Sequence, residues 1–323
     1  MTRLGLLARG DSSGISNQTE EVFRHLRPAK TLIVDLGQRN RGPFRPHRFV
    51  DRDHCETRVT FSPTPDDDEI RWLVQDIDCL YIVETNTHSG LNRHCMENGT
   101  RLIVHANPEL YDANYGEPPA EVWAATTWRL DLLPGTTRIV PHPVATDRIA
   151  SREVTTVSRA LHVPCQAMLD RNGTDLVEKA ASRLRTEISV HVPGQVDDYW
   201  NLWHGADALI LPRRYAGLCL TMQEAAAAGL PIVMLETDPN AYRTIPELLI
   251  PVTASDQHRM KGGMVDVYDA DPYGVAEVID RLADPDIVAR GSAASRAWAE
   301  EIAWTRLLPT WQRLLGLEHE VNA

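Results

Sequence analysis

The chain has 323 residues, 43% of them hydrophobic and 24% charged, a composition typical of globular proteins with room for two domains of about 150 residues. The 33 basic and 45 acidic residues give a formal net charge of −12 at pH 7. This charge argues against a protein that coats nucleic acid or an anionic membrane through its overall electrostatic field. The net charge is still compatible with a local basic surface on an acidic protein. No apolar run approaches the roughly 20 residues that span a bilayer, so we expect no membrane span.

The cysteines indicate a reducing compartment. They are widely spaced, odd in number and without a C-x-x-C pair, at Cys55, Cys79, Cys95, Cys165 and Cys219. Such a set argues against a disulfide scaffold and against a structural zinc site. The start of the chain, 1–7, has one basic residue and a very short apolar stretch, which predicts a strand and not a signal peptide. We therefore expect a cytoplasmic protein.

The first half alternates short apolar runs with amphipathic stretches. Strands are predicted at 4–8, 31–36, 79–84, 101–105 and 122–126, and helices at 19–26 and 91–98. Strands that alternate with helices form parallel sheets covered on both faces. The first half is therefore predicted to be an α/β domain.

A proline-rich connector at 139–144 ends this half, after which the alternation restarts. Further strands are predicted at 160–163, 188–192, 208–211 and 232–235, and helices at 174–184, 197–204, 220–228, 275–282, 287–300 and 304–315. Open parallel sheets bind ligands at the carboxyl ends of their strands. We predict an α/β protein of two doubly wound, Rossmann-like domains that face each other across a cleft.

One segment, 211–231, carries most of the chemistry. It is predicted to run from a strand through a glycine loop into a helix that begins near residue 220. Backbone N–H groups at 218–221 would favour a phosphate, both by hydrogen bonding and through the helix dipole. Glu224 lies one turn inside the helix, where its carboxylate can reach hydroxyl groups of the same ligand. These features fit a nucleotide-linked sugar, although an ordinary strand–helix unit with a surface glutamate has the same pattern.

The same segment, L-P-R-R-Y-A-G-L-C-L-T-M-Q-E-A-A-A-A-G-L-P, resembles the signature of family-4 glycosyltransferases of the GT-B fold. The stretches 199–208, 137–149 and 271–304 are similar to the passages that surround this signature in the family. The resemblance covers 137–316, whereas earlier residues match only in outline. It implies an acceptor-side domain at 1–146, a nucleotide-sugar-binding domain at 147–303 and, within 304–323, a last helix that crosses back onto the first domain.

The resemblance implies an enzyme that moves a sugar from a UDP- or GDP-sugar to an acceptor hydroxyl, with retention of configuration and without a metal or cofactor. In the family the first of two glutamates contacts the sugar and the second contacts the nucleotide ribose. Glu224 matches the second, but Ala216 stands at the first position, so the usual sugar recognition does not carry over. A small residue there resembles a phage-associated branch, which would place the protein in a bacterium or a phage-infected host.

The resemblance also nominates the residues of the donor site. In the family, a basic residue in the first loop of the second domain clamps the donor diphosphate and stabilises it as it departs, which points to Arg171 beside Asn172. Arg214, beside the glycine loop of the signature segment, is the alternative clamp. Either could instead be a surface arginine paired with an aspartate. The remaining donor-binding candidates are Gly14, Gly217, Leu218, Cys219, Leu220 and Glu224.

Acceptor-side candidates lie in the first half. The loop after the first predicted strand resembles the glycine loop that lines the cleft in this fold, which nominates Asp11, Ser13 and Gly14. His105 and Glu84 end predicted strands, where a histidine or carboxylate near the reacting sugar can take part in catalysis. A buried structural histidine is the alternative for His105.

Two acidic triplets, 66–68 and 76–78, have the composition of the metal-binding D-x-D of other glycosyltransferases. The first leads into a predicted helix, where aspartates are expected in the first turn, and the second precedes its strand. Both are therefore predicted to be structural, and no metal is required.

An arginine-rich loop, Arg39–Arg52, carries an aromatic residue among its cations. Through Arg45 and Arg48 it could track a phosphate backbone, which makes a hydroxylated or hydroxymethylated base in phage DNA one candidate acceptor. The loop could equally be a solvated segment whose arginines form ion pairs with acidic residues of the protein. Two other functions stay open, a transferase for a small-molecule, glycan or protein hydroxyl and a nucleotide-sugar-binding protein without turnover. The sequence defines neither the acceptor nor the oligomeric state.

Overall fold

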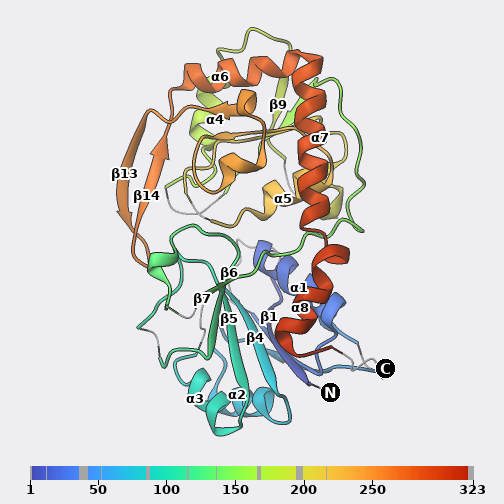
Figure 1. Ribbon diagram of the computed structural model, residues 1–323, viewed down its shortest axis with the longest axis vertical. Helices are drawn as coiled ribbons and strands as arrows, with labels where there is room; N and C mark the ends of the chain where they lie inside the picture. The colour runs from blue at the N-terminus through green and yellow to red at the C-terminus, as the bar shows by residue number, and fades with distance from the viewer. Residues whose placement is uncertain are drawn as a thin grey trace. The chain divides into compact units, whose positions relative to one another are not determined.

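The computed structural model describes residues 2–11, 13–35, 43–51, 53–84, 88–114, 116–135, 137–165, 169–193, 199–215 and 217–318. They form two compact units, each built on its own parallel sheet (Figure 1). Unit 1 comprises Met1–Pro141, Met260–Gly263 and Leu307–Ala323, and unit 2 comprises His142–Arg259 and Met264–Arg306. Among the described residues, no helix combines the length and the apolar character needed to cross a membrane.

Unit 1 contains a seven-stranded sheet in the order β3-β2-β1-β4-β5-β6-β7, in which all neighbouring strands are parallel. The strands are β1 (Leu4–Arg9), β2 (Lys30–Val34), β3 (Glu56–Thr60), β4 (Cys79–Glu84), β5 (Arg101–Ala106), β6 (Glu121–Ala124) and β7 (Thr137–Ile139). In the interior strand β1, Leu6 lies opposite Thr31 of β2 and Tyr81 of β4. Every residue of β1 is buried, as expected for a central parallel strand.

Unit 2 contains a five-stranded parallel sheet in the order β12-β11-β10-β8-β9. Its strands are β8 (Arg159–Leu161), β9 (Ser189–His191), β10 (Ala208–Leu211), β11 (Ile232–Leu235) and β12 (Leu249–Ile250). A separate antiparallel hairpin is formed by β13 (Ala254–Arg259) and β14 (Met264–Asp269) (Figure 1). The two doubly wound parallel sheets predicted from the alternation are thus confirmed.

The α-helices of the described residues are α1 (Gly14–Leu26), α2 (Asp67–Val74), α3 (Leu91–Glu97), α4 (Thr174–Ala181), α5 (Leu220–Ala227), α6 (Pro272–Asp280), α7 (Pro285–Glu301) and α8 (Trp304–Leu315). Four of the helices, α1, α2, α6 and α7, begin directly after a residue whose side chain caps the helix. Asp271 and Asp284 cap α6 and α7, and each is followed by a proline at the first helical position. The starts predicted at 275 and 287 were therefore too late, and Ser13, which caps α1, likewise moves that start from 19 to Gly14.

The first acidic triplet is structural, as predicted. Asp66 caps α2 by accepting a hydrogen bond from the Glu69 backbone N–H at 2.8 Å, and the Glu69 side chain accepts one from the Asp66 N–H at 2.9 Å. This reciprocal pair is a capping box. In the second triplet, Asp78 accepts a hydrogen bond from the Arg3 backbone N–H at 2.7 Å.

From Leu307 onward, α8 belongs to unit 1, in agreement with the predicted return of the last helix. Trp311 is fully buried there, and its indole N–H donates to the Pro141 carbonyl at 3.2 Å. The Arg101 guanidinium donates to the Leu314 carbonyl at 2.6 Å. These contacts attach the end of the described chain to the first sheet.

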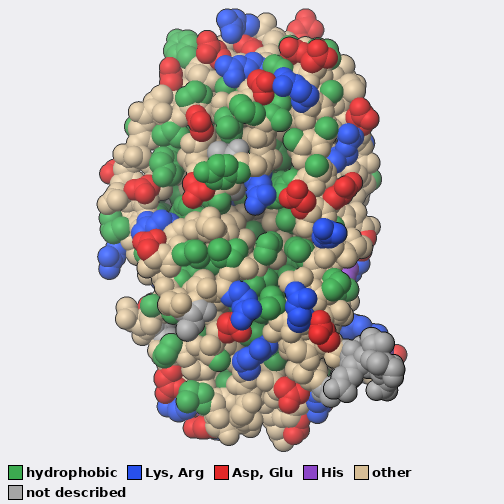
Figure 2. All heavy atoms as spheres, viewed as in Figure 1, with side chains coloured by type: hydrophobic (Ala, Val, Ile, Leu, Met, Phe, Trp, Pro, Cys, Tyr) green, Lys and Arg blue, Asp and Glu red, His purple; other side chains and the backbone are tan. Residues whose placement is uncertain are grey.

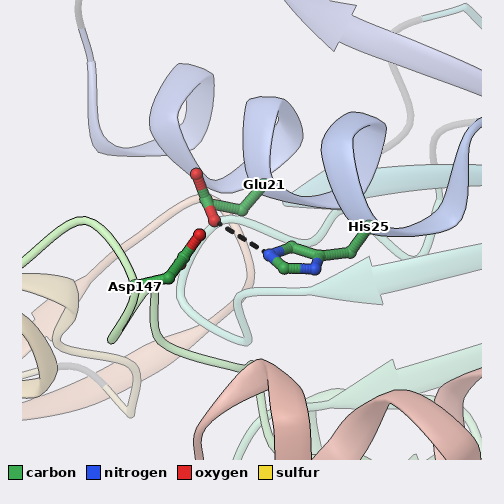
Figure 3. Close-up of side chains that lie close together, drawn as sticks. All are labelled: Glu21, His25 and Asp147. Carbon is green, nitrogen blue, oxygen red and sulfur yellow. Dashed lines mark ion pairs between the residues drawn. The ribbon is translucent and has the colours of Figure 1, made fainter.

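Helix α1 carries more buried polar groups than its sequence pattern indicates. Glu20 and Glu21 are only 5% and 3% exposed. Glu21 forms an ion pair with His25, one turn later on the same helix, at 3.4 Å (Figure 3), and another with Arg24 at 2.8 Å. On the face of the protein that Figure 2 shows, acidic and basic side chains are interspersed.

Candidate functional site

The second sheet has a topological switch between β8 and β10. The two strands are neighbours, but the chain continues from β8 to β9 on one side and from β10 to β11 on the other. In sheets of this order, ligands bind where the loops after the two central strands diverge. The described residues of these loops, 162–165 and 169–173 after β8 and 212–215 and 217–219 after β10, contain most of the donor-binding candidates predicted from the sequence.

Hydrogen bonds tie the two loops together. The Arg214 backbone N–H donates to the Arg171 carbonyl at 2.8 Å. The buried Arg213 guanidinium donates to Asn172 Oδ1 at 3.0 Å and to the Leu218 carbonyl at 2.9 Å. Asn172 in turn donates to the Val163 carbonyl at 2.8 Å. The loops therefore form one connected surface at the switch point.

The β8–α4 loop has an unusual backbone. Leu169, Asp170 and Gly173 have φ values of 62°, 44° and 70°, in the left-handed region. A Cβ atom on Gly173 would lie 2.5 Å from the Pro212 carbonyl oxygen, so only glycine fits between the loops at this point. Left-handed conformations at non-glycine residues concentrate at functional sites because the surrounding structure has to maintain them.

Glu224 lies in α5, one turn after the helix begins, and is only 4% exposed. Its Oε2 atom accepts a hydrogen bond from the Tyr199 hydroxyl. Tyr199 packs edge-on against Trp200, with ring centroids 5.4 Å apart, and the Arg148 guanidinium lies over Trp200 at 4.4 Å. The short 3-10 helix Tyr199–Trp203 thereby brings a phenol hydroxyl to the carboxylate. The helix predicted for 197–204 takes this tighter form over its described residues.

Cys219, the residue that precedes α5, is surrounded by the charged candidates. Burial raises the pKa of the Cys219 thiol, while the charges of Arg213 and Arg171 lower it and the charge of Glu224 raises it. Burial is the main cause of the raised pKa, and the charges of these three side chains modify it. With a raised pKa the thiol stays protonated and is a poor nucleophile.

The two arginines predicted as diphosphate clamps differ in their surroundings. Arg214 forms ion pairs with Asp175 at 2.6 Å and with Asp269 of β14 at 3.4 Å. Its charge is thus balanced by two carboxylates, which corresponds to the structural alternative considered for this residue. The Arg171 guanidinium lies over the Tyr215 ring, 5.0 Å from the centroid, and belongs to the group around Cys219.

The predicted acceptor-side residues gather at the switch point of the first sheet, between β1 and β4. The Arg9 guanidinium forms an ion pair with Glu84 at 2.7 Å and another with Asp11 at 3.6 Å. Asp11 accepts a hydrogen bond from the Ser13 backbone N–H at 2.9 Å, and Gly14 follows as the first residue of α1. Glu84 has a φ of 77°, again in the left-handed region. Sequence reasoning did not single out Arg9, which joins the two carboxylates.

His105 lies inside unit 1, with 2% of its surface exposed. Its Nδ1 atom is 2.8 Å from the Tyr81 hydroxyl, and its ring packs against Trp123 and Trp311 at centroid distances of 5.8 and 5.7 Å. Burial lowers the pKa of His105 to about 3, so the ring is neutral at pH 7. These contacts match the structural alternative for His105.

The arginine-rich loop lies only partly within the described residues. Arg48 donates to Asn17 at 2.7 Å and to Ser16 at 3.3 Å, and it also pairs with Glu20 of α1. The Arg45 backbone N–H donates to the Gly10 carbonyl at 2.6 Å. Four residues of the sequence argument, Arg39, Arg41, Arg52 and Ala216, fall outside the described residues.

Sequence reasoning did not single out two residues of this candidate site, Arg213 and Tyr199. A signal for Arg213 was present, since two consecutive arginines stand just beyond the end of a buried strand, where ligands of parallel sheets bind. Nothing in the Tyr199–Trp200 pair indicated a contact with Glu224, because that contact depends on the fold.

Comparisons with known proteins agree with this geometry. Residues 165–269 match the family model described as "Glycosyl transferases group 1", so this part of the chain is similar to the domain that the model describes. The matched range contains α5, the loop after β10 and the loop after β8 from residue 165 onward. A comparison with curated proteins gives no match.

Solved structures match over nearly the whole chain. HepE from Anabaena, in complex with UDP, is 12% identical with a TM-score of 0.67 over 98% of this chain and 100% of its own. Sucrose-phosphate synthase from Thermosynechococcus elongatus is 12% identical, with a TM-score of 0.65 and the same coverage. The lipopolysaccharide outer core galactosyltransferase WaaB is 10% identical, with a TM-score of 0.65 over 98% of this chain and 99% of its own. The fold is therefore GT-B, as the resemblance implied.

Proposed function

We propose that the protein is a glycosyltransferase that moves a sugar from a nucleotide-sugar donor to an acceptor hydroxyl. The observation that carries the proposal is the joined pair of loops at the β8/β10 switch point, with the start of α5 and the buried Glu224 carboxylate beside it. A helix start favours phosphate oxygens and a carboxylate favours hydroxyl donors. A nucleoside diphosphate carries both phosphate oxygens and ribose hydroxyl groups, so it can bind to the helix start and to the carboxylate at once.

We propose a UDP-sugar as the donor. Structures of HepE from Anabaena contain UDP and UDP-glucose, and the pneumococcal O-GlcNAc transferase GtfA was crystallised with UDP and GlcNAc. Glu224 would accept hydrogen bonds from the ribose, and the backbone N–H groups that begin α5 would bind the diphosphate. A GDP-sugar is the alternative, distinguished by the same binding assay.

The proposed reaction proceeds with retention of configuration and without a metal. The diphosphate leaves on the face that the acceptor hydroxyl attacks, and an oxygen of the leaving group accepts the hydroxyl proton. The C–O bond to the diphosphate breaks as the bond to the acceptor forms, so no protein nucleophile is required. Because Cys219 stays protonated and His105 lies in an aromatic cluster, neither is assigned a covalent role. The protein would act by orienting the substrates and by stabilising charge on the leaving group.

For the acceptor we favour a small-molecule, glycan or protein hydroxyl. The Arg9–Asp11–Glu84 group at the switch point of unit 1 carries two carboxylates and one guanidinium, which suits polar, hydroxylated ligands. A hydroxymethylated base in phage DNA is the second candidate. It rests on the arginine-rich loop, but Arg48 of that loop is engaged by Glu20 and is less available to phosphate.

The test is release of nucleotide from a panel of UDP- and GDP-sugars, with glycans, small alcohols and hydroxymethylated duplex DNA as acceptors. We expect UDP release that depends on an acceptor and is abolished in Glu224→Ala. Tight UDP-sugar binding without release across all acceptors would contradict the enzyme and support the nucleotide-sugar-binding alternative that Ala216 suggested. UDP release only in the presence of hydroxymethylated duplex DNA would identify the modified base as the acceptor.

A further inference from the structure

Three arginines surround the joined loops, and they differ in how their charge is balanced. Arg214 has two carboxylate partners, and Arg171 lies over the Tyr215 ring. Arg213 is 6% exposed and hydrogen-bonds only to neutral acceptors, the Asn172 amide oxygen and the Leu218 carbonyl. Within the described ranges, no carboxylate oxygen lies within ion-pair distance of Arg213, and its Nε–H is buried without an acceptor.

A buried guanidinium without a carboxylate partner is costly, because the desolvation of the cation is not repaid by an opposite charge. An anionic ligand would supply the missing opposite charge, and guanidinium groups bind phosphate oxygens through charge-assisted hydrogen bonds. Each acceptor of Arg213 belongs to one of the two loops, since Asn172 comes from the loop after β8 and Leu218 from the loop after β10. The uncompensated charge of Arg213 therefore lies between the two loops at the β8/β10 switch point, where sheets of this order bind their ligands.

We infer that Arg213 is the resident positive charge of the donor site, a positioning residue that fixes both loops and selects a dianionic diphosphate over a neutral nucleoside. This inference rests on the proposed function, and it names the residue that gives the site its charge preference. Arg213 acts through the Leu218 backbone and through its electrostatic field, which the neighbouring Cys219 thiol also experiences. Because the guanidinium is held by neutral partners, its charge remains available to the phosphate oxygens.

The test is a ligand series that differs only in charge, namely uridine, UMP and UDP, measured by calorimetry on the full chain. We expect Arg213→Gln to weaken UDP binding by about tenfold to a hundredfold. Uridine binding is expected to change by less than about threefold, since uridine carries no phosphate. Arg185→Gln is the matched control, because it removes the same charge from an exposed arginine of unit 2 that pairs with Asp280.

Arg213→Lys provides the second variant, which keeps the charge and loses the two-pronged hydrogen bonding. We expect it to retain a clear preference for UDP over uridine, and this preference to fall with added salt as in the wild type. An equal loss of uridine and UDP affinity in Arg213→Gln would overturn the inference, because it would show a purely structural role. A loss of the preference for UDP over uridine in Arg213→Lys would also overturn the inference.

The same measurements separate this inference from the proposed function. If the wild type binds none of the three ligands and no guanosine counterpart, the nucleotide-sugar proposal fails and the inference fails with it. If the wild type prefers UDP and Arg213→Gln keeps the full preference, only the role of Arg213 is overturned. For either conclusion, the Arg185→Gln control has to bind uridine, UMP and UDP with the affinities of the wild type.

Discussion

The Tyr199 hydroxyl donates a hydrogen bond to Oε2 of Glu224, a carboxylate that is almost completely buried. A buried carboxylate needs hydrogen-bond donors to remain ionised at low cost. The contact fixes one carboxylate oxygen and sets the direction of the other. Tyr199 therefore orients the group to which we assign the nucleotide ribose.

We expect Tyr199→Phe to weaken UDP binding by about tenfold, because a hydrogen bond to a charged group is lost and the carboxylate is no longer held in one direction. Calorimetric titration with UDP measures this. Tyr273→Phe removes a hydroxyl from an exposed tyrosine in the same unit and serves as the control. Tighter binding in Tyr199→Phe would mean that the phenol competes with the ligand instead of orienting the carboxylate.

Gly173→Ala is expected to destabilise the protein by about 1–2 kcal/mol or more, since alanine is strained at positive φ. The added methyl group would also meet the Pro212 carbonyl and push the two loops apart. Thermal unfolding and UDP affinity should both decrease. Gly274→Ala is the matched control, because no atom lies within 4 Å of the added carbon and the residue sits in α6. Equal effects of the two substitutions would contradict the role of Gly173 at the loop contact.

The neutral His105 makes stability depend on pH. Its pKa is lowered to about 3 in the folded protein, whereas the unfolded chain takes up a proton near pH 6.5. The unfolded state therefore binds more protons between these values, so stability is lost as pH falls below about 6.5. On going from pH 6.5 to 5 this amounts to on the order of 2 kcal/mol.

Urea unfolding of the wild type at pH 7 and pH 5 measures this loss, and we expect His105→Phe to show a smaller decrease between the two values. The exposed His47 gives the control variant His47→Gln, which should keep the full pH dependence. If His105→Phe and the wild type lose stability equally on acidification, the ring is not held neutral in the fold.

Arg48→Gln is expected to reduce stability by about 3 kcal/mol, because it takes the Arg48 partner away from the buried Glu20 carboxylate. The double variant with Glu20→Gln should recover part of the loss. Chemical denaturation of the three variants gives the coupling between the two residues. Unchanged stability together with a strong loss of activity on modified DNA would instead favour the DNA acceptor.

Much of the fold could be predicted from the sequence because the relevant signals are local. Apolar runs of four to six residues located the central strands of both sheets, and most predicted bounds agree with the structure to within two residues. The sequence analysis missed β3, the two-residue strand β12 and the hairpin of β13 and β14. The edge strand β3 consists mostly of polar residues, and exposed side chains alternate with half-buried ones along most of it. In the hairpin, β13 is almost entirely exposed. Neither strand has the continuous apolar run that is typical of a buried parallel strand.

The site was less predictable because its charge balance depends on long-range contacts. The signature segment predicted the helix that begins near residue 220, with Glu224 one turn inside it, and this helix is α5. The neutralisation of Arg214 involves Asp269, which comes from the hairpin that no pattern indicated. The environment of His105 is completed by Trp311 of α8, far along the chain. Pairings of this kind appear only once the chain is folded.

The most direct test of the donor site is a crystal structure of the protein soaked with UDP. We predict the ribose hydroxyls within hydrogen-bond distance of Glu224 and the diphosphate at the start of α5, beside the loop held by Arg213. Nucleotide bound at any other place, with the β8 and β10 loops unoccupied, would contradict the account.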